Sequence, residues 1–372
     1  MDVAWDRGES MPDIRLETLR KEFKDVVAVC DVSITFPSSS VTCLLGPSGC
    51  GKTTLMRMIA GLEKPTSGEV YFDERRMTTL KPETRNIGMV FQYPVVYRGL
   101  DVYRNIDLPL KEAGLSEDQR KKRIEEVSEI LDLKKNIHQN INQLDNNARQ
   151  KVAVARAVAR RPQIILFDEP LTNVDVETKV QLKQALKELT RQLKQTIVYV
   201  THDQTEAMTL ADQIALMNEG EIVQQDKPRT LYNDPNTVFG GWFLGNPGMN
   251  FVHVEVSLSN GVHMVRNPLF PKPVRISGVG QQEKLIIGIR PEHMRILHTQ
   301  SKNSVQAEVI TSSIQVGGQY LIMLRIGDVT LKAKKRSEAG KELGDRVQVE
   351  LPIEHVMVFT QDGKRTSIEL RL

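Results

Sequence analysis

The sequence feature that most constrains the fold is a glycine-rich loop between an apolar run and a helical pattern. The loop extends from Gly46 to Thr53 and matches the pattern G-x-x-x-x-G-K-[ST]. Residues 41–45 before it are apolar or β-branched, as in a buried strand of a parallel sheet. After it come apolar residues at the spacing of one helix face, namely Leu55, Met58, Ile59 and Leu62, and Gly61 near the end of this segment is a stop signal. The order strand, loop, helix predicts a phosphate-binding loop in an α/β fold.

This loop suits a polyphosphate for two reasons. Its glycines allow backbone N–H groups to turn inwards, and the N-terminus of the following helix adds its dipole. Lys52 would reach the β- and γ-phosphates, and the Thr53 hydroxyl would ligate Mg²⁺. Of Cys50 we expect only that its side chain is small. The residues expected to bind the polyphosphate here are Gly46, Pro47, Ser48, Gly49, Cys50, Gly51, Lys52, Thr53 and Thr54.

Two more polar groups follow apolar strands further along the chain. Asp168 and Glu169 follow the run 164–167, and we expect the first to hold the Mg²⁺ shell and the second to polarise an attacking water. His202 follows the run 196–200. An acid at a loop start, or a single histidine at a strand end, is often structural. Because open α/β sheets bind ligands at the carboxyl ends of their strands, the shared edge favours a functional role for all three, with His202 on the γ-phosphate.

The rest of the chain divides into a helical insert and a β-rich region. Residues 100–160 show the periods of amphipathic helices, and the basic run 120–123 is interpreted as a solvated face rather than a binding patch. Near residue 240, glycine and proline cluster, and short β-like runs separated by turn residues follow. We therefore predict two domains, residues 1–238 with a helical subdomain at about 95–160, and residues 239–372 as a small all-β barrel.

Composition excludes several classes of protein. The 50 Lys and Arg against 47 Asp and Glu give a net charge of +3, which is too little for a surface that coats nucleic acid. The three cysteines fit a reducing compartment rather than a disulfide framework. No stretch approaches the roughly 18 apolar residues of a membrane span, and the acidic opening MDVAWDRGES is unlike a signal peptide. We expect a cytosolic chain that touches a membrane only through a partner.

Together, these residues resemble the ATP-binding cassette (ABC) ATPases of transporters. Gln92 is similar to that family's Q-loop, residues 173–175 with Asp175 to its D-loop, and residues 201–203 to its H-switch. Phe23 is in the place of the aromatic residue that stacks on adenine; the alternative is an ordinary packed residue of a hairpin. Residues 288–293, GIRPEH, resemble the hallmark of the regulatory OB-type domain in the maltose and glycerol-3-phosphate importer branch.

The resemblance implies a fold, cofactors and a catalytic set. The fold would be a P-loop NTPase (RecA-like) α/β domain with a helical subdomain, followed by an all-β OB-type regulatory domain. ATP and Mg²⁺ would be bound, and Gln92 would join Thr53 and Asp168 near the metal. Gln92, Glu169 and His202 would form the catalytic set, and the chain would hydrolyse ATP to import a carbohydrate or polyol.

The resemblance also implies partners. Two transmembrane permease subunits would receive the segment after Gln92, through Tyr97 and Arg98. A second ATPase subunit would complete the nucleotide sites, and an extracytoplasmic solute-binding protein would act indirectly. The chain would lie peripherally on the cytoplasmic face of the cell membrane, and no nucleic-acid partner is expected.

One family motif is changed in this sequence. The family's signature L-S-G-G-Q binds the γ-phosphate held by the opposite subunit, and in its place this chain has Leu144, Asp145, Asn146, Asn147 and Ala148. A carboxylate about 5 Å from a phosphate charge costs roughly 3 kcal/mol at an effective dielectric near 20, which predicts a weakened site facing the partner. The alternative is that Asp145 turns away as a helix N-cap.

The altered motif leaves several functions open. We hypothesise that the chain pairs with a second, non-identical ATPase that carries an intact signature. Residues 91–97 and 245–250 also resemble one of the paired ATPases of glycerol or polyol importers. The alternative is an ATP-binding regulatory cassette with weak or no hydrolysis. A soluble ABC protein of DNA repair or translation is disfavoured, because the sequence contains one phosphate loop.

Overall fold

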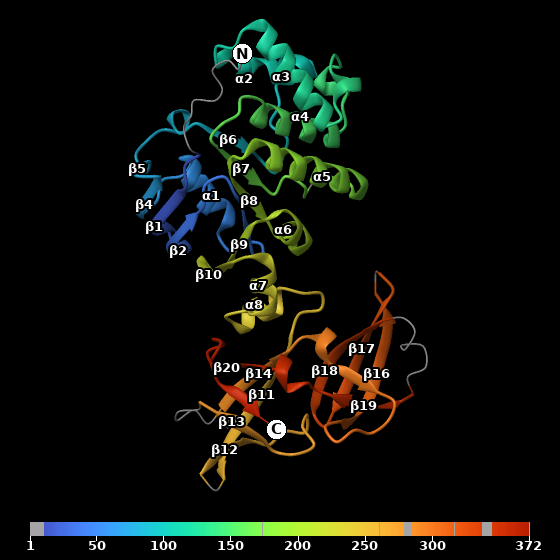
Figure 1. Ribbon diagram of the computed structural model, residues 1–372. Helices are drawn as coiled ribbons and strands as arrows, with labels where there is room; N and C mark the ends of the chain where they lie inside the picture. The colour runs from blue at the N-terminus through green and yellow to red at the C-terminus, as the bar shows by residue number, and fades with distance from the viewer. Residues whose placement is uncertain are drawn as a thin grey trace. The chain divides into compact units, whose positions relative to one another are not determined.

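The computed structural model of the chain describes residues 11–172, 174–259, 261–278, 284–315, 317–336 and 344–371. Asn173, part of the expected D-loop, and the opening ten residues lie outside these ranges. The chain separates into two compact units, Met1–Arg229 and Thr230–Leu372 (Figure 1). The division precedes the predicted boundary at residue 238, because the residues between bond to the second unit. The Val238 N–H donates to Gly363 O at 2.8 Å, and Arg290 Nε donates to Tyr232 O at 3.0 Å.

The centre of the first unit is a six-stranded sheet in the order β10-β9-β3-β8-β7-β6 (Figure 1). Five strands pair in parallel, and β10 joins β9 antiparallel at one edge. β3, β7 and β8 are buried along their whole length, which explains their nearly continuous apolar sequences. The strands are β3 (Val41–Leu45), β6 (Ile87–Val90), β7 (Ile164–Asp168), β8 (Thr196–Thr201), β9 (Gln213–Asn218) and β10 (Glu221–Asp226).

A four-stranded antiparallel sheet, in the order β2-β1-β4-β5, completes the β structure of the first unit. Its inward-facing residues share one hydrophobic core with α1 and with strands of the six-stranded sheet. The core therefore fixes α1 and the loop before it against both sheets. The strands are β1 (Ile14–Phe23), β2 (Val26–Phe36), β4 (Ser67–Phe72) and β5 (Arg75–Arg76), with a 3₁₀ turn at Pro82–Thr84.

Helix α1 (Lys52–Ala60) follows the glycine-rich loop, as the sequence predicts. Leu55, Met58 and Ile59 are fully buried. Gly61, at φ 77°, ends the helix in the left-handed conformation that glycine adopts without strain. The prediction for Leu62 is wrong: it lies beyond the helix end and is 49% exposed.

The helical subdomain consists of α2 (Val102–Glu112), α3 (Glu117–Ile130) and α4 (Asn146–Ala159), which lie together in Figure 1. Short 3₁₀ turns at Lys134–Asn136 and Ile141–Gln143 connect α3 to α4. Arg123 of α3 is buried, and its guanidinium donates to Ala159 O at 2.9 Å and to Val158 O at 3.1 Å. The interpretation of residues 120–123 as a solvated face is therefore wrong for Arg123, which satisfies carbonyls at the end of α4.

The remaining helices of the chain are short, apart from α5. They are α5 (Val176–Leu193), α6 (Gln204–Leu210), α7 (Pro228–Asn233) and α8 (Val238–Phe243).

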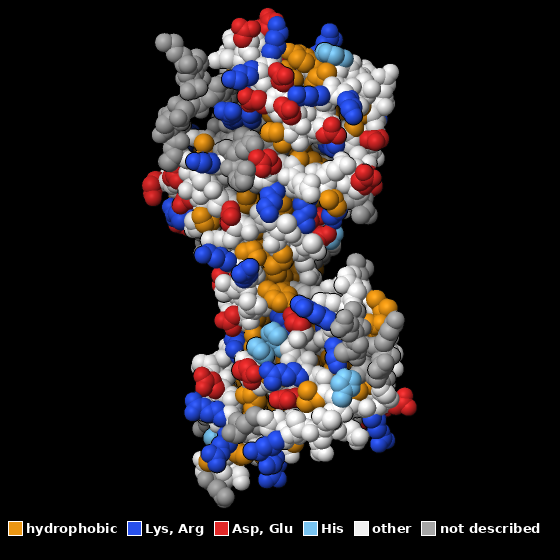
Figure 2. Space-filling view, turned by 45° about the vertical axis from the view of Figure 1, so that its right-hand side comes forward, with side chains coloured by type: hydrophobic (Ala, Val, Ile, Leu, Met, Phe, Trp, Pro, Cys, Tyr) orange, Lys and Arg blue, Asp and Glu red, His pale blue; other side chains and the backbone are white. Residues whose placement is uncertain are grey.

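Within the described ranges, no helix combines the length and apolar character that crossing a lipid bilayer requires. Figure 2 shows Lys and Arg side chains interspersed with Asp and Glu on the face of the first unit that it presents, in keeping with the small net charge.

The second unit holds two sheets, in the orders β20-β14-β11-β12-β13-β21 and β15-β19-β16-β17-β18. One hydrophobic core joins them. Among the described residues of the second unit, 3₁₀ turns occur at Pro291–His293 and Ile353–His355. The strands are β11 (Asn250–Ser259), β12 (Val262–Val265), β13 (Val274–Ser277), β14 (Lys284–Ile289), β15 (Arg295–Leu297), β16 (Val305–Ile314), β17 (Gln319–Ile326), β18 (Val329–Arg336), β19 (Arg346–Glu350), β20 (Met357–Phe359) and β21 (Glu369–Arg371).

We predict that Arg123→Met lowers the melting temperature of the chain. Methionine keeps most of the apolar stem but leaves the buried carbonyls of Val158 and Ala159 without their donor, a loss of about 1–3 kcal/mol. Differential scanning calorimetry measures the change. Lys122→Met, at the exposed neighbouring position, is the matched control and should have little effect. Equal melting temperatures for the two variants would contradict the capping role of Arg123.

Candidate nucleotide-binding site

The predicted site residues follow the carboxyl ends of neighbouring parallel strands. The order β3-β8-β7-β6 places the ends of these four strands side by side. Their register aligns the ends to within a residue or two, so the segments that follow leave the sheet at one edge. The paired residues nearest this edge are Leu45 with Thr201, Asp168 with Val200, and Val90 with Phe167. The phosphate loop, Gln92, Glu169 and His202 therefore start from a common edge.

The glycine-rich loop has a backbone that side chains would prevent. Gly49 and Gly51 have φ angles of 82° and 105°, in the left-handed region. A Cβ atom on Gly51 would lie 2.2 Å from the carbonyl oxygen of Ala28, and one on Gly46 would lie 2.2 Å from that of Met217. The loop therefore depends on glycine both for its conformation and for its close approach to β2 and β9.

Lys52 lies inside the concavity of this loop. Its side chain is buried, and its Nζ donates to Gly46 O at 2.9 Å and to Pro47 O at 2.8 Å. Burial also raises the pKa of the neighbouring Cys50 thiol, so Cys50 is neutral in the loop. The loop thus holds a cation at its centre, as binding of an anionic polyphosphate requires.

Thr53 and Asp168 meet across the sheet edge. The Thr53 hydroxyl donates to Asp168 Oδ1 at 2.9 Å, and Asp168 is 5% exposed. Burial raises the pKa of the Asp168 carboxyl, although the hydrogen bond from Thr53 opposes the shift. Within the described residues, no three His, Cys, Asp or Glu side chains cluster to hold a metal. One hydroxyl and one carboxylate are oxygen donors that suit Mg²⁺, which completes its shell with phosphate and water oxygens.

Glu169 and His202 are in direct contact. His202 Nδ1 lies 3.0 Å from Glu169 Oε2, and the Thr172 hydroxyl donates to the same oxygen at 3.1 Å. Because an ionised carboxylate can only accept, Nδ1 carries the proton in this contact. Glu169 has a φ of 46°, a left-handed backbone that is uncommon outside glycine, and its N–H donates to Val200 O at 3.0 Å. Backbone and side chain therefore both aim Glu169 at the end of β8.

Gln92 follows β6 at this edge, whereas Phe23 lies on a strand of the four-stranded sheet. Gln92 comes two residues after β6, and the Gln150 amide donates to the preceding carbonyl, Phe91 O, at 3.3 Å. Phe23 ends β1 and is 44% exposed, with Lys21 Nζ 4.7 Å from its ring centroid. The alternative interpretation required Phe23 to be packed in a hairpin, and this exposure argues against it.

Asp145 is the N-cap of α4, which is the second of the two alternatives that the sequence left open. Its Oδ1 accepts from the Ala148 N–H at 2.7 Å. The Asn147 amide donates to the Asp175 carboxylate, which caps α5 by accepting from the N–H and the hydroxyl of Thr178, both at 2.9 Å. The altered motif is thus bonded to the expected D-loop residue of the same chain.

Sequence reasoning missed a charged cluster beside His202. Lys179 of α5 lies 2.7 Å from both Asp203 Oδ2 and Glu206 Oε1. The spacing of Asp203 and Glu206 at the start of a helix marks an N-terminus, but nothing in the sequence assigns them Lys179 as a partner. The buried Gln150 was missed for the same reason, since its contact with Phe91 spans 59 positions.

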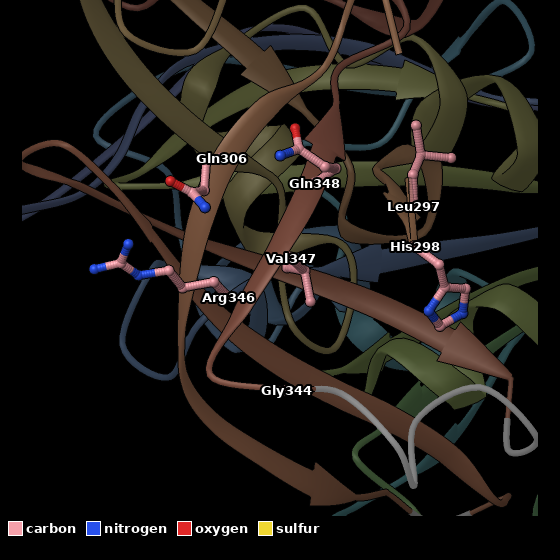
Figure 3. A pocket seen from close by; sticks show the side chains of 7 residues that line it. All are labelled: Leu297, His298, Gln306, Gly344, Arg346, Val347 and Gln348. Carbon is pink, nitrogen blue, oxygen red and sulfur yellow. The ribbon is translucent and has the colours of Figure 1, made fainter. Parts of the chain in front are cut away.

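Two hollows lie away from this edge. A cavity of about 160 Å³ in the second unit is lined by side chains that point in different directions (Figure 3). A wider hollow of about 470 Å³ in the first unit includes residues that precede β6 and β7 and therefore lies at the amino ends of these strands. Neither includes a residue of the predicted nucleotide site. The first is lined by Leu297, His298, Gln306, Gly344, Arg346, Val347 and Gln348.

Comparisons with known proteins assign both units to families. Residues 29–172 match the ABC transporter family, residues 245–294 the MalK OB fold domain, and residues 287–359 the TOBE domain. A trehalose/maltose import ATP-binding protein MalK of Thermococcus litoralis is 37% identical over 366 residues, covering 94% of this chain and 98% of that protein. An sn-glycerol-3-phosphate import ATP-binding protein UgpC of Chromohalobacter salexigens is 35% identical over 365 residues, covering 95% and 96%.

A solved structure is similar to the first part of the chain. It is a dimeric ATP-binding cassette in a post-hydrolysis state bound to ADP and Pi, with a TM-score of 0.53 and 32% identity. The match covers 58% of this chain and 99% of that one.

We predict that Asp168→Asn does not lower the melting temperature of the chain but reduces its stabilisation by MgATP. The raised pKa of Asp168 means that its ionised form is less favourable in the folded chain than in the unfolded one, so above the unfolded pKa the charge opposes folding. Asparagine can still accept from Thr53. We expect the variant to melt at an equal or higher temperature at pH 7, while losing the Mg²⁺-dependent part of its stabilisation by ATP. Thermal melts with and without MgATP measure both effects.

The control for this prediction is Asp175→Asn. The hydrogen bond from the Thr178 N–H lowers the pKa of Asp175, so its charge favours folding above the unfolded pKa and its removal should lower the melting temperature. A lower melting temperature for Asp168→Asn, with the MgATP response intact, would contradict the assignment of Asp168.

Proposed function

The chain belongs to the ABC transporter ATPases of the MalK and UgpC type, and on this premise we propose that it binds and hydrolyses ATP to drive import of a carbohydrate or polyol. The family and fold class are those predicted from the sequence. The observation that carries the proposal is the Glu169–His202 contact, which lies at the same sheet edge as the phosphate loop and the Thr53–Asp168 pair. A protein that only binds nucleotide has no need of this second carboxylate.

We propose that each group at the edge has its own task. Lys52 moves from the carbonyls of its loop to the β- and γ-phosphates, and the backbone N–H groups of the loop hold their oxygens. Thr53 and Asp168 would hold Mg²⁺, which would supply charge neutralisation when bound. Phe23 offers its exposed ring to adenine, and Gln92 orients the water from the end of β6.

Glu169 is the proposed base. Its contacts with His202 and Thr172 both end on Oε2, so Oε1 is the oxygen that we assign to the attacking water. His202 donates through Nδ1 and fixes the carboxylate, while its second ring nitrogen serves the γ-phosphate side of the site. In-line attack on the γ-phosphorus then releases ADP and inorganic phosphate.

The permease partners are proposed to dock on the segment that follows Gln92. Tyr93, Val95 and Tyr97 are exposed there. The segment is held firmly, because Asn105 binds both backbone groups of Tyr97 and the guanidinium of Arg156 lies 4.3 Å from the ring centroid of Tyr97. Through these permeases the chain would sit peripherally on the cytoplasmic side of a membrane and respond to a solute-binding protein on the other side.

We also propose that this chain pairs with a second ATPase whose signature is intact. Asp145 brings a carboxylate to the N-terminus of α4, where the family presents a hydroxyl and glycine N–H groups to the partner's γ-phosphate. As an N-cap it occupies the N–H of Ala148 and still adds charge at that end. Both effects disfavour an ATP molecule on the opposite face, so a symmetric pair of this chain would be weakened at two sites and a mixed pair at one.

We predict that Glu169→Gln retains MgATP binding and loses hydrolysis by about 10²-fold to 10⁴-fold, because the amide cannot accept the proton of water. Phosphate release by the full chain in its native membrane complex measures turnover, and equilibrium binding of ATP measures affinity. Glu177→Gln, an exposed acid of α5, is the control and should be unchanged. Undiminished phosphate release by the complex would remove Glu169 from its role and would favour the regulatory cassette.

We predict that Asp145→Ser increases ATP-dependent self-association. In a Glu169→Gln background, the serine keeps the N-cap and removes a repulsion of roughly 3 kcal/mol per unit charge at an effective dielectric near 20. That change corresponds to about 10²-fold in the dimerisation constant. Analytical ultracentrifugation with ATP measures it, and Asp118→Ser on the exposed start of α3 is the control.

The identity of the partner is tested separately. Tagged full-length chain is recovered from its native membranes in mild detergent, and the ATPase-sized bands are identified by mass spectrometry. A second ATPase with an intact signature supports the mixed pair. Recovery of this chain alone with its permeases, together with strong ATP-dependent dimerisation of the unaltered Asp145 chain, would overturn it.

A further inference from the structure

Lys179 joins two carboxylates that belong to the turn carrying His202. Its Nζ donates at 2.7 Å to Asp203 Oδ2, and it lies 2.7 Å from Glu206 Oε1. The Glu206 side chain is only 4% exposed. It also accepts from the hydroxyls of Thr201 at 2.7 Å and Tyr199 at 3.1 Å. One ammonium on α5 thus contacts two acids at the start of α6, and Glu206 connects it to the end of β8 through Thr201.

These contacts fix the backbone on both sides of His202. The Asp203 N–H donates to Thr201 Oγ1 at 3.0 Å. Asp203 Oδ1 caps α6 by accepting from the N–H groups of Thr205 at 2.8 Å and Glu206 at 3.2 Å. His202 itself is 45% exposed and has Glu169 as its side-chain partner. Because its own side chain is little packed, the position of the ring depends on the turn that carries it.

The charges make Lys179 the critical member of the cluster. Although partial burial opposes the shift, hydrogen bonds with Asp203 and Glu206 raise the pKa of Lys179. The same lysine lowers the pKa of Asp203 against its desolvation. Without Lys179, the carboxylates of Asp203 and the buried Glu206 would face each other without a cation, and removing one partner of such a group is far more costly than an exposed ion pair suggests.

We propose that Lys179 is a positioning residue for His202, and that it sets the distance between His202 and Glu169 by holding Asp203 and Glu206 to α5. The proposal rests on the proposed function, since it concerns the same hydrolytic site. Lys179 does not touch nucleotide and acts only through the turn.

Lys179 also lies close on α5 to a residue that contacts the altered signature. Asp175 caps the helix four residues earlier, about one helical turn, and accepts from Asn147 of α4. One turn of α5 therefore joins the altered signature to the His202 turn within the same chain.

The test compares variants of the full chain in its native membrane complex. Lys179→Met should lower the kcat of ATP hydrolysis about 10-fold to 100-fold, the size of effect that a small misplacement of a catalytic group produces, with the KM for MgATP within about twofold. Lys179→Arg, which can contact both carboxylates, should restore kcat. Lys183→Met is the matched control, because Lys183 lies one turn further on α5 and, among the described residues, its side chain donates to Thr205 O at 3.3 Å rather than to a carboxylate.

A second comparison asks whether Lys179 acts through His202. On a His202→Ala background, Lys179→Met should cause little further loss of kcat, because the group that it positions is already absent. If Lys179→Met does not fold, as judged by its thermal melt, the paired change of Lys179→Gln with Glu206→Gln removes the charge and its main partner together and is measured instead.

The outcomes separate this inference from the proposed function. An active unaltered complex in which Lys179→Met leaves kcat unchanged, or in which its effect adds in full to that of His202→Ala, overturns the positioning role alone. An unaltered complex that binds MgATP but hydrolyses none overturns the proposed function. A loss of kcat that is rescued by arginine and is absent on the His202→Ala background supports both.

Discussion

Parallel pairing of three buried strands is the constraint on which the site depends. β3, β8 and β7 are buried along their whole length, so neither face of these strands meets water. A slip of one residue in their pairing would shift the loops that follow them relative to one another. The same interaction that stabilises the core therefore brings a cation, an oxygen pair and a carboxylate–imidazole pair to one edge, although Lys52 and His202 lie 150 positions apart in the chain.

Several polar groups at this edge are connected to the helices around the sheet. Thr53 and Asp168 link α1 to β7, Gln150 links α4 to the Q-loop segment, and Lys179 links α5 to the His202 turn. Each link ends on a backbone group or a carboxylate next to a proposed functional residue. Helices are stiff over these lengths, so their relative positions, and not only local loop geometry, determine whether the edge is assembled for catalysis.

Sequence alone predicted the parts of the site that follow from local pattern. A phosphate loop needs glycine and lysine at fixed spacing, and an apolar run that ends in an acid or histidine marks the edge of a parallel sheet. Contacts between distant segments carry no such pattern. The burial of Arg123 depends on the carbonyls of Val158 and Ala159, and the partner of Lys179 depends on how α5 lies against α6. The prediction that Leu62 lies on the buried face of α1 was wrong for a different reason, since periodicity does not show whether a helix stops at Ala60 or completes another turn.

Asp145 of the altered signature has a structural role as the N-cap of α4. A carboxylate that accepts from Ala148 N–H stabilises α4, so the substitution is tolerated by the fold of this chain and its cost falls on a ligand outside it. Asn147 replaces a residue that the family uses as bare backbone, and it bonds to Asp175 instead. Asp145 and Asn147 are thus both bonded within this chain, and Asp145 brings a carboxylate to the N-terminus of α4. The proposal of two non-identical ATPases rests on these contacts and on that charge.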